Sequence, residues 1–276
     1  MDASLSAERP ATPLLSARRA GWLRRHEPAV VTLGSLVAFV GLWQAVAVFG
    51  HLGPSIFAGP GPVLQTLVRL AASGELLEHL VATGSIFFAG FGLSAISGVL
   101  IGLLLGTNED VEAILGPYLM ALYAAPRVAF VSLLLVWMGI GPSSKIALVF
   151  LSAFFPIALN TMTGARSVDA VLLRAARSYG AGRRHQFVKV VLPFSVPYIL
   201  AGLRLGVGRA LIGAFVAEMF GATAGIGYLI IRAGYEFRAA SLLAGVLVLA
   251  ACSVLLTEAL RWAGHRLAPW QQDTVI

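Results

Sequence analysis

Charged residues are scarce in this sequence of 276 residues. Asp, Glu, Lys and Arg make up 12% of it, whereas an ordinary soluble domain carries roughly 25%. Apolar residues account for 58%, and the mean hydropathy is +0.85. A soluble chain of this length could not cover its surface with so few charges. The composition therefore excludes an ordinary soluble domain and predicts a protein surrounded largely by lipid.

Cysteine is almost absent, and the usual catalytic and nucleotide-binding patterns are missing. The single cysteine, Cys252, lies in an apolar run, which excludes an internal disulfide and a cysteine-based metal site. No P-loop of the form G-x-x-x-x-G-K-[ST] occurs. The five histidines lack the spacing of metal ligands and are scattered at His26, His51, His79, His185 and His265. We therefore expect no catalytic residue, metal or cofactor in this chain.

The basic residues fall between apolar runs and form no continuous stripe. The formal net charge is +7 and the isoelectric point about 10.2. Segmental clustering of this kind is typical of the positive-inside bias of membrane proteins and argues against nucleic-acid binding. Residues 1–28 are predicted to be a disordered, basic, cytoplasmic leader, which contains Arg9, Arg18, Arg19, Arg24 and Arg25.

Long apolar runs predict an all-α membrane protein with about six transmembrane helices. A helix needs about 20 mostly apolar residues to cross the bilayer. Runs that meet this need lie at 29–49, 84–106, 113–141, 146–165, 205–222 and 241–260. The third is interrupted by Pro117, Pro126 and Arg127, and we expect it to cross once as a kinked helix. Residues 29–270 form the predicted transmembrane domain in the lipid bilayer.

The distribution of Lys and Arg predicts the orientation. If the leader lies inside, six crossings place 107–112, 166–197 and the C-terminus in the cytoplasm as well. The segment 166–197 carries Arg166, Arg174, Arg177, Arg183, Arg184 and Lys189. The outer segments carry fewer basic residues, namely Arg69, Lys145, Arg232 and Arg238. This asymmetry favours cytoplasmic N- and C-termini in a multi-pass membrane protein.

The basic segment 166–197 has the pattern of two short helices. Apolar residues at helical spacing lead to Ala175, and Gly180 and Gly182 can end that helix. A second short helix would lead to Pro193, where the chain returns to the membrane. Two short helices at an angle would project into the cytoplasm as a knob, a shape that a separate soluble protein can push.

This segment resembles the EAA signature of ABC importer permeases. The signature reads Glu-Ala-Ala, three residues, Gly, nine residues, then Ile-x-Leu-Pro. The chain keeps the spacing throughout, with Arg174 in place of the Glu and Val190 in place of the Ile. The resemblance implies a coupling helix that seats on a separate ATPase, with the contacts made by Ala175, Ala176, Gly180, Ala181, Val190, Leu192 and Pro193.

Similarity to this family extends from about residue 54 to residue 270. Residues 154–161, 201–222 and 225–230 resemble the nitrate, sulfonate and taurine branch of these permeases. The resemblance implies a type I ABC importer bundle in a bacterial inner membrane. It also implies a second permease copy in a homodimer, two ATPase subunits that use ATP and Mg, and an extracytoplasmic solute-binding protein. The implied cargo is a small anion such as a sulfonate, taurine or nitrate.

Four polar residues within the apolar runs are candidates for the translocation path. An ionisable group in the membrane is costly, so Arg209 and Glu218 should face protein or a water-filled path. Glu218 fits a gate or a buried ion pair, and Arg209 fits the path or a head group near the interface. Arg127 could attract an anion or pair with a carbonyl. Asn160 could line the path or bridge helices.

Other functions remain open at this point. An importer of a neutral vitamin precursor would use the same machinery. A transporter driven by an ion gradient would show inverted repeats with broken helices, and a membrane enzyme would show clustered catalytic side chains within its spans. The sequence shows neither pattern.

Overall fold

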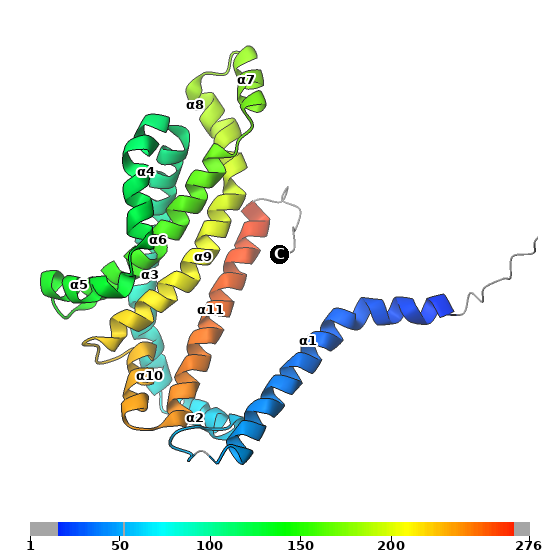
Figure 1. Cartoon of the computed structure of the whole chain (residues 1–276), viewed down its shortest axis with the longest axis vertical. Coiled ribbons are helices and arrows are strands. Elements are labelled where there is room, and N and C mark those ends of the chain that lie inside the picture. The colour runs from blue at the N-terminus through cyan, green and yellow to red at the C-terminus, as the bar shows by residue number, and fades with distance from the viewer. Residues whose placement is uncertain (1–15, 52, 268–276) are drawn as a thin grey trace, which may run out of the picture. The chain divides into compact units, whose positions relative to one another are not determined.

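The computed structural model describes residues 16–51 and 53–267, and every regular element in that part of the chain is a helix (Figure 1). The chain divides into two units, Met1–Gly53 with Gly59–Gly61, and Pro54–Ala58 with Pro62–Ile276. Each unit is described by itself. The elements are α1 Ser16–Phe49, α2 Pro60–Ala72, α3 Glu75–Thr107, α4 Glu109–Ala124, η1 Arg127–Ala129, α5 Phe130–Met138, α6 Pro142–Arg166, α7 Ala170–Ser178, α8 Arg183–Gln186, η2 Phe187–Val191, α9 Leu192–Met219, α10 Ile226–Tyr235 and α11 Ala239–Leu267.

The helix α1 contains the predicted first span. Its segment Val31–Phe49 is long and apolar enough to cross a membrane. The helix begins at Ser16, so residues 16–28 of the predicted disordered leader are helical. Good helix formers, mainly Ala, Leu and Arg, dominate this stretch and extend the helix beyond its apolar part. Residues 1–15 of the leader lie outside the described residues.

Four helices of the second unit match predicted runs. Helices long and apolar enough to span lie at Glu75–Thr107, Pro142–Arg166, Arg183–Met219 and Ala239–Arg266. Each begins before the apolar run that predicted it, because a helix continues through polar residues that a hydropathy criterion leaves out. The described residues thus contain five candidate spans in all.

The remaining predicted crossing, 113–141, is not one kinked helix. It consists of α4 and α5, separated by Ala125, Pro126 and the short η1, and neither helix is among the five candidate spans. Ala125 is extended, with ψ of 140°, because a residue before proline is disfavoured in the helical region. Pro117 lies inside α4 without ending it.

The direction of α6 relative to α3 shows which ends of these helices the broken segment 108–141 connects. Gly90 lies beside Val149, and Gly106 lies beside Ala165, so the two helices run in the same direction. The chain must therefore return from the end of α3 to the start of α6 through residues 108–141 (Figure 1). The broken segment makes that single return.

Small residues on α3 bring it into backbone contact with α6. Every fourth residue from 90 to 106 is Gly or Ser. A Cβ on Gly102 would lie 2.5 Å from the carbonyl oxygen of Ala158, and Ser94 Oγ donates a 2.9 Å hydrogen bond to the Phe150 carbonyl. Close approach of this kind is how membrane helices associate without a hydrophobic driving force.

The core lies where α6 meets both α3 and α9. The helix α9 runs antiparallel to α6, since Gly202 faces Ile157 and Gly213 faces Ser152. Buried side chains from the three helices form the central cluster, which includes Ile86, Phe87, Val149, Ile157, Val207 and Leu211. At one end of this bundle lie α7 and α8, and at the opposite end lies α10 (Figure 1).

Candidate coupling site and translocation path

The predicted knob is present and is built from α7, α8 and η2. Asp169 caps α7, its side chain accepting a 2.7 Å hydrogen bond from the Val171 amide. Gly180 follows the helix with φ of 80°, in the left-handed region. The Ala181 amide donates to the Ala176 carbonyl at 3.0 Å, and the Gly180 amide to the Arg177 carbonyl at 2.9 Å. This pair of bonds is a Schellman motif, which favours glycine at the left-handed position.

A buried glutamine holds the turn of the knob together. Gln186 Nε2 donates to the Ala181 carbonyl at 2.7 Å, and Arg177 Nε donates to Gln186 Oε1 at 3.4 Å. Gln186 thus links α8 to the end of α7. The sequence does not single out this residue, because a lone glutamine in a basic segment follows no spacing rule that would distinguish it.

The second half of the motif forms the base of the knob. Val190 and Leu192 pack with Val191 against Leu103 and Ala165, at the ends of α3 and α6. Pro193 lies in the first turn of α9, where its missing N–H leaves no bond unmade. These residues fasten the knob to the bundle.

The outer surface of the knob is both apolar and cationic. Tyr179, at the end of α7, is 93% exposed, and Val171 and Leu172 are exposed on the same helix. Ala175 and Arg174 are exposed as well, and Ala176 is half-buried. Asp169 is the one acidic residue in 166–197. Such a surface suits a partner that offers carboxylates around an apolar depression.

One candidate path residue lines a hollow beside the broken segment. Arg209 lies on α9 at a cavity of about 190 Å³ between η1, α6 and α9. Val128 and Ser152 contribute to the same cavity. The side chain of Arg127 lies outside the described part of the structure, although its neighbour Val128 is in place. A basic group, a hydroxyl and apolar side chains therefore line the same cavity.

Asn160 lies elsewhere on α6. Its Nδ2 donates a 2.7 Å hydrogen bond to the Pro156 carbonyl of the same helix. It is half-buried where α6 faces Gly202 of α9. Eight residues separate it from Ser152, about 12 Å along a helix, so the structure does not bring it into the cavity of Arg209.

Glu218 is buried at the end of α9 and binds the start of α10. The residue as a whole is 2% exposed. Thr83 Oγ1 donates to Glu218 Oε1 at 2.8 Å, and the Gly227 amide donates to Oε2 at 2.7 Å. Thr83 Oγ1 in turn accepts a 2.8 Å bond from the Ile226 amide. The carboxylate therefore connects α9, α3 and α10.

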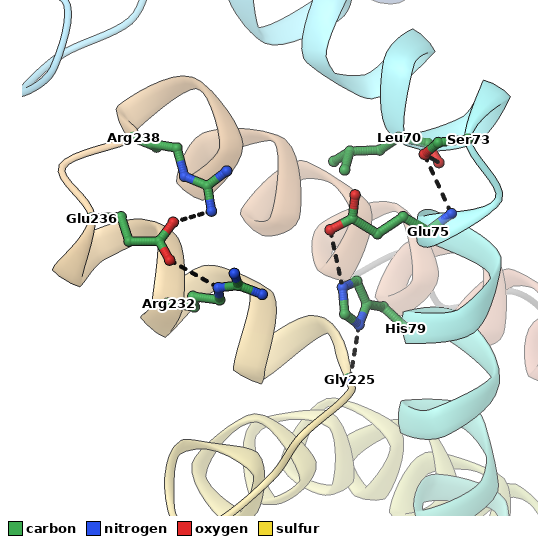
Figure 2. Close-up of polar contacts among 8 residues, drawn as sticks. All are labelled: Leu70, Ser73, Glu75, His79, Gly225, Arg232, Glu236 and Arg238. Carbon is green, nitrogen blue, oxygen red and sulfur yellow. Dashed lines mark hydrogen bonds and ion pairs between the residues drawn. The ribbon is translucent and has the colours of Figure 1, made fainter.

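A histidine completes this contact. His79 Nδ1 accepts a 3.1 Å hydrogen bond from the Gly225 amide, and its Nε2 lies 3.7 Å from Glu75 Oε1 (Figure 2). Three successive amides, at residues 225–227, are thus satisfied by three side chains. The first amides of a helix lack partners within it, so this cluster caps α10. The sequence assigned no capping role to His79, which was named only as a scattered histidine, or to Thr83, which was not singled out; their spacing of four on an apolar helix was the available signal.

The chain is similar to membrane components of known transport systems. Residues 98–272 match the family model described as the inner membrane component of binding-protein-dependent transport systems. The taurine transport system permease protein TauC of Escherichia coli is 33% identical over 267 residues, 94% of this chain and 96% of the relative. The putative aliphatic sulfonates transport permease protein SsuC of Bacillus subtilis is 34% identical over 257 residues, 93% and 90% of the two chains.

Two further matches broaden the comparison. The formylaminopyrimidine transport permease protein ThiX of Halalkalibacterium halodurans is 34% identical over 250 residues, 90% of this chain and 98% of the relative. A chain of the MetNI methionine ABC transporter, in an inward-facing conformation, matches with a TM-score of 0.57 and 20% identity. That match covers 70% of this chain and 94% of the solved one, and it shows the fold.

Proposed function

Because this chain belongs to the inner membrane components of binding-protein-dependent transport systems, we propose that it is the permease of an ATP-driven importer for a small organic anion of the sulfonate class. It is a permease component of an ABC transport system, and this membership leaves the gradient-driven alternative without support. The observation that supports coupling to an ATPase is the knob, which projects from one end of the bundle (Figure 1).

The knob supports docking of a separate ATPase. Tyr179, Val171 and Arg174 are exposed on it, whereas the residues of its base are packed against α3 and α6. We propose that two ATPase subunits, which use ATP and Mg, bind two such knobs. Closure of the ATPase pair would then rotate the two bundles between outward and inward openings.

The position of Arg209 supports pairing with a second copy of this chain. Arg209 lies near the middle of α9 and is exposed in the single chain. An arginine in the membrane needs a protein partner or water. A homodimer with the path between its two halves would supply both. Arg127, Asn160, Arg209 and Glu218 remain the proposed path residues, with Arg209 best placed because it lines a cavity.

The proposed cargo follows from the relatives and from Arg209. Two of the relatives are permeases for taurine and aliphatic sulfonates, and a guanidinium in the path would favour an anion. A second candidate is a neutral pyrimidine, favoured by the similarity to the formylaminopyrimidine permease.

Uptake by reconstituted vesicles tests the cargo. The permease is inserted with its ATPase, and the solute-binding proteins of the same cells are added one at a time. ATP-dependent uptake of labelled taurine and of labelled formylaminopyrimidine is measured, and each is competed with unlabelled alkanesulfonate, nitrate and formylaminopyrimidine. Uptake of taurine that an alkanesulfonate inhibits supports the first candidate, whereas uptake of the pyrimidine without uptake of taurine supports the second. Absence of any ATP-dependent uptake would contradict the importer proposal.

The knob also orients the chain. ATP is available in the cytoplasm, so we place the knob there, and α11 ends at the same end of the bundle (Figure 1). This arrangement supports a cytoplasmic C-terminus in an inner membrane. A reporter that fluoresces only in the cytoplasm, fused to the C-terminus, should be bright, and a dark fusion would contradict the orientation.

A further inference from the structure

The turn between α10 and α11 exposes two aromatic side chains. Tyr235 is 83% exposed and Phe237 is 70% exposed. The turn lies outside the candidate spans, one of which ends at Met219 while the next begins at Ala239. It also lies at the end of the bundle opposite to the knob (Figure 1). Two large rings are therefore presented on the side away from the ATPase.

The backbone of this turn is strained at the second ring. The Arg238 amide donates to the Ala233 carbonyl at 2.8 Å and the Phe237 amide to the Gly234 carbonyl at 3.1 Å, the same Schellman pattern that Gly180 makes in the knob. Phe237 holds the left-handed position with φ of 52°. Glycine is the usual residue there, and strained positions cluster at functional sites. A phenyl ring thus stands at a position where glycine would fit the backbone better.

Ionic contacts fix the turn. Glu236 accepts a 2.9 Å bond from Arg232 Nε and pairs with Arg238 as well (Figure 2). The hydrogen bond from Arg232 lowers the pKa of the Glu236 carboxyl, so the carboxylate stays ionised at neutral pH. Two guanidinium groups against one carboxylate leave the turn with an excess of positive charge.

The rest of α10 gives the turn a rigid support. Ile226, Leu229, Ile230 and Ala233 of α10 are buried against the bundle. At its other end, the amides of residues 225–227 are held by His79, Thr83 and Glu218. A short helix anchored along its length and at its start holds the turn in one place.

We propose that this turn is a docking surface for the extracytoplasmic solute-binding protein, with Tyr235 and Phe237 entering an apolar depression that acidic residues flank. The proposal rests on the proposed function, because the family depends on a binding protein. Aromatic and arginine side chains dominate the energetics of protein interfaces. Three ionised side chains between residues 232 and 238, outside the spans, favour a water-facing protein contact over the lipid surface.

The test uses the complete transporter in lipid nanodiscs and the binding protein that supports uptake by the wild type. Affinity for that binding protein and its stimulation of ATP hydrolysis are measured for Phe237→Gly and Tyr235→Ala. Each should weaken binding by about tenfold or more, in the range of interface hot spots. Phe237→Gly should keep or raise the melting temperature, because it relieves the backbone. Trp262→Ala, an exposed aromatic near the end of α11, is the matched control and should bind normally.

Each outcome bears on the proposal. Unchanged affinity and unchanged stimulation in both variants would overturn it. Unchanged affinity, together with loss in the variants of a stabilisation by anionic lipid that the wild type shows in the nanodisc, would identify the turn as a lipid contact and overturn it equally. A wild type with no binding-protein-dependent uptake would instead refute the proposed function, so the two failures are distinguishable.

Discussion

The Glu218 carboxylate and the Thr83 hydroxyl meet at 2.8 Å, joining the last turn of α9 to α3. Thr83 also accepts the Ile226 amide, and Glu218 accepts the Gly227 amide. Neither side chain has a cationic partner among these contacts. The pair therefore acts as a cap on α10, built from two other helices.

Removing the hydroxyl of Thr83 should destabilise the protein. Thr83→Val preserves the shape of the side chain but leaves the Ile226 amide without its acceptor and Glu218 without one donor. A buried group without a partner costs about 1–3 kcal/mol, so the melting temperature in mild detergent should fall. Thr83→Ser keeps the hydroxyl and should retain most of the stability. An unchanged melting temperature in Thr83→Val would contradict the cap.

Replacing Glu218 by glutamine should impair transport. Glutamine keeps one oxygen acceptor, whereas the carboxylate uses both of its oxygens, so one of the two contacts is lost and α10 is less firmly held. We expect slower ATP-dependent uptake and a lower melting temperature. Glu236→Gln, at an exposed carboxylate, should change the melting temperature less. Equal uptake and equal stability in Glu218→Gln would make the carboxylate dispensable.

Valine at position 180 should uncouple ATP hydrolysis from uptake. No atom lies within 4 Å of a Cβ placed on Gly180, so the cost comes from its φ of 80°. The left-handed region costs about 1–2 kcal/mol for a residue other than glycine, and valine should shift the turn of the knob. Gly180→Asn tolerates this region and serves as the control. Normal coupled uptake in Gly180→Val would refute the coupling role.

The glycines of α3 allow a paired test of helix packing. Gly102→Ala would bring a Cβ within 2.5 Å of the Ala158 carbonyl, whereas a Cβ on Gly92 meets nothing within 4 Å. Overpacking costs about 1–3 kcal/mol, and alanine within a helix otherwise gains about 0.5–1 kcal/mol over glycine. Gly102→Ala should therefore lower the melting temperature and Gly92→Ala should not. Equal melting temperatures for the two variants would contradict the close approach.

The charge of Arg209 should matter only for an anionic cargo. For a sulfonate, Arg209→Gln should raise the KM of uptake by about tenfold, equivalent to about 1.4 kcal/mol, while Arg209→Lys should raise it less. For a neutral pyrimidine, both variants should leave the KM close to that of the wild type. Sulfonate uptake with an unaltered KM in Arg209→Gln would place this residue outside the path.

The sequence predicted features that depend on local pattern. Apolar runs located the spans, and Gly180 predicted where the first helix of the knob would end. The same reasoning failed for 113–141, because it treated Pro126 as a kink although the proline separates two helices. It also missed His79 and Thr83, whose partners are backbone amides at residues 225 and 226. Every residue except proline carries a backbone amide. The sequence therefore does not indicate which distant amide a side chain will bind.

The backbone contact between α3 and α6 restricts how the chain can move. Along residues 90–106, a run of about 24 Å, any axial slip would drive the Cβ of Ala165 or the carbonyl of Ala158 into the opposite backbone. The two helices should therefore move as one rigid unit. Any hinge of this chain has to lie outside residues 90–106 of α3 and the part of α6 that they contact. A displacement applied at the end where Gly106 meets Ala165 would be transmitted to the end where Gly90 meets Val149 with little loss.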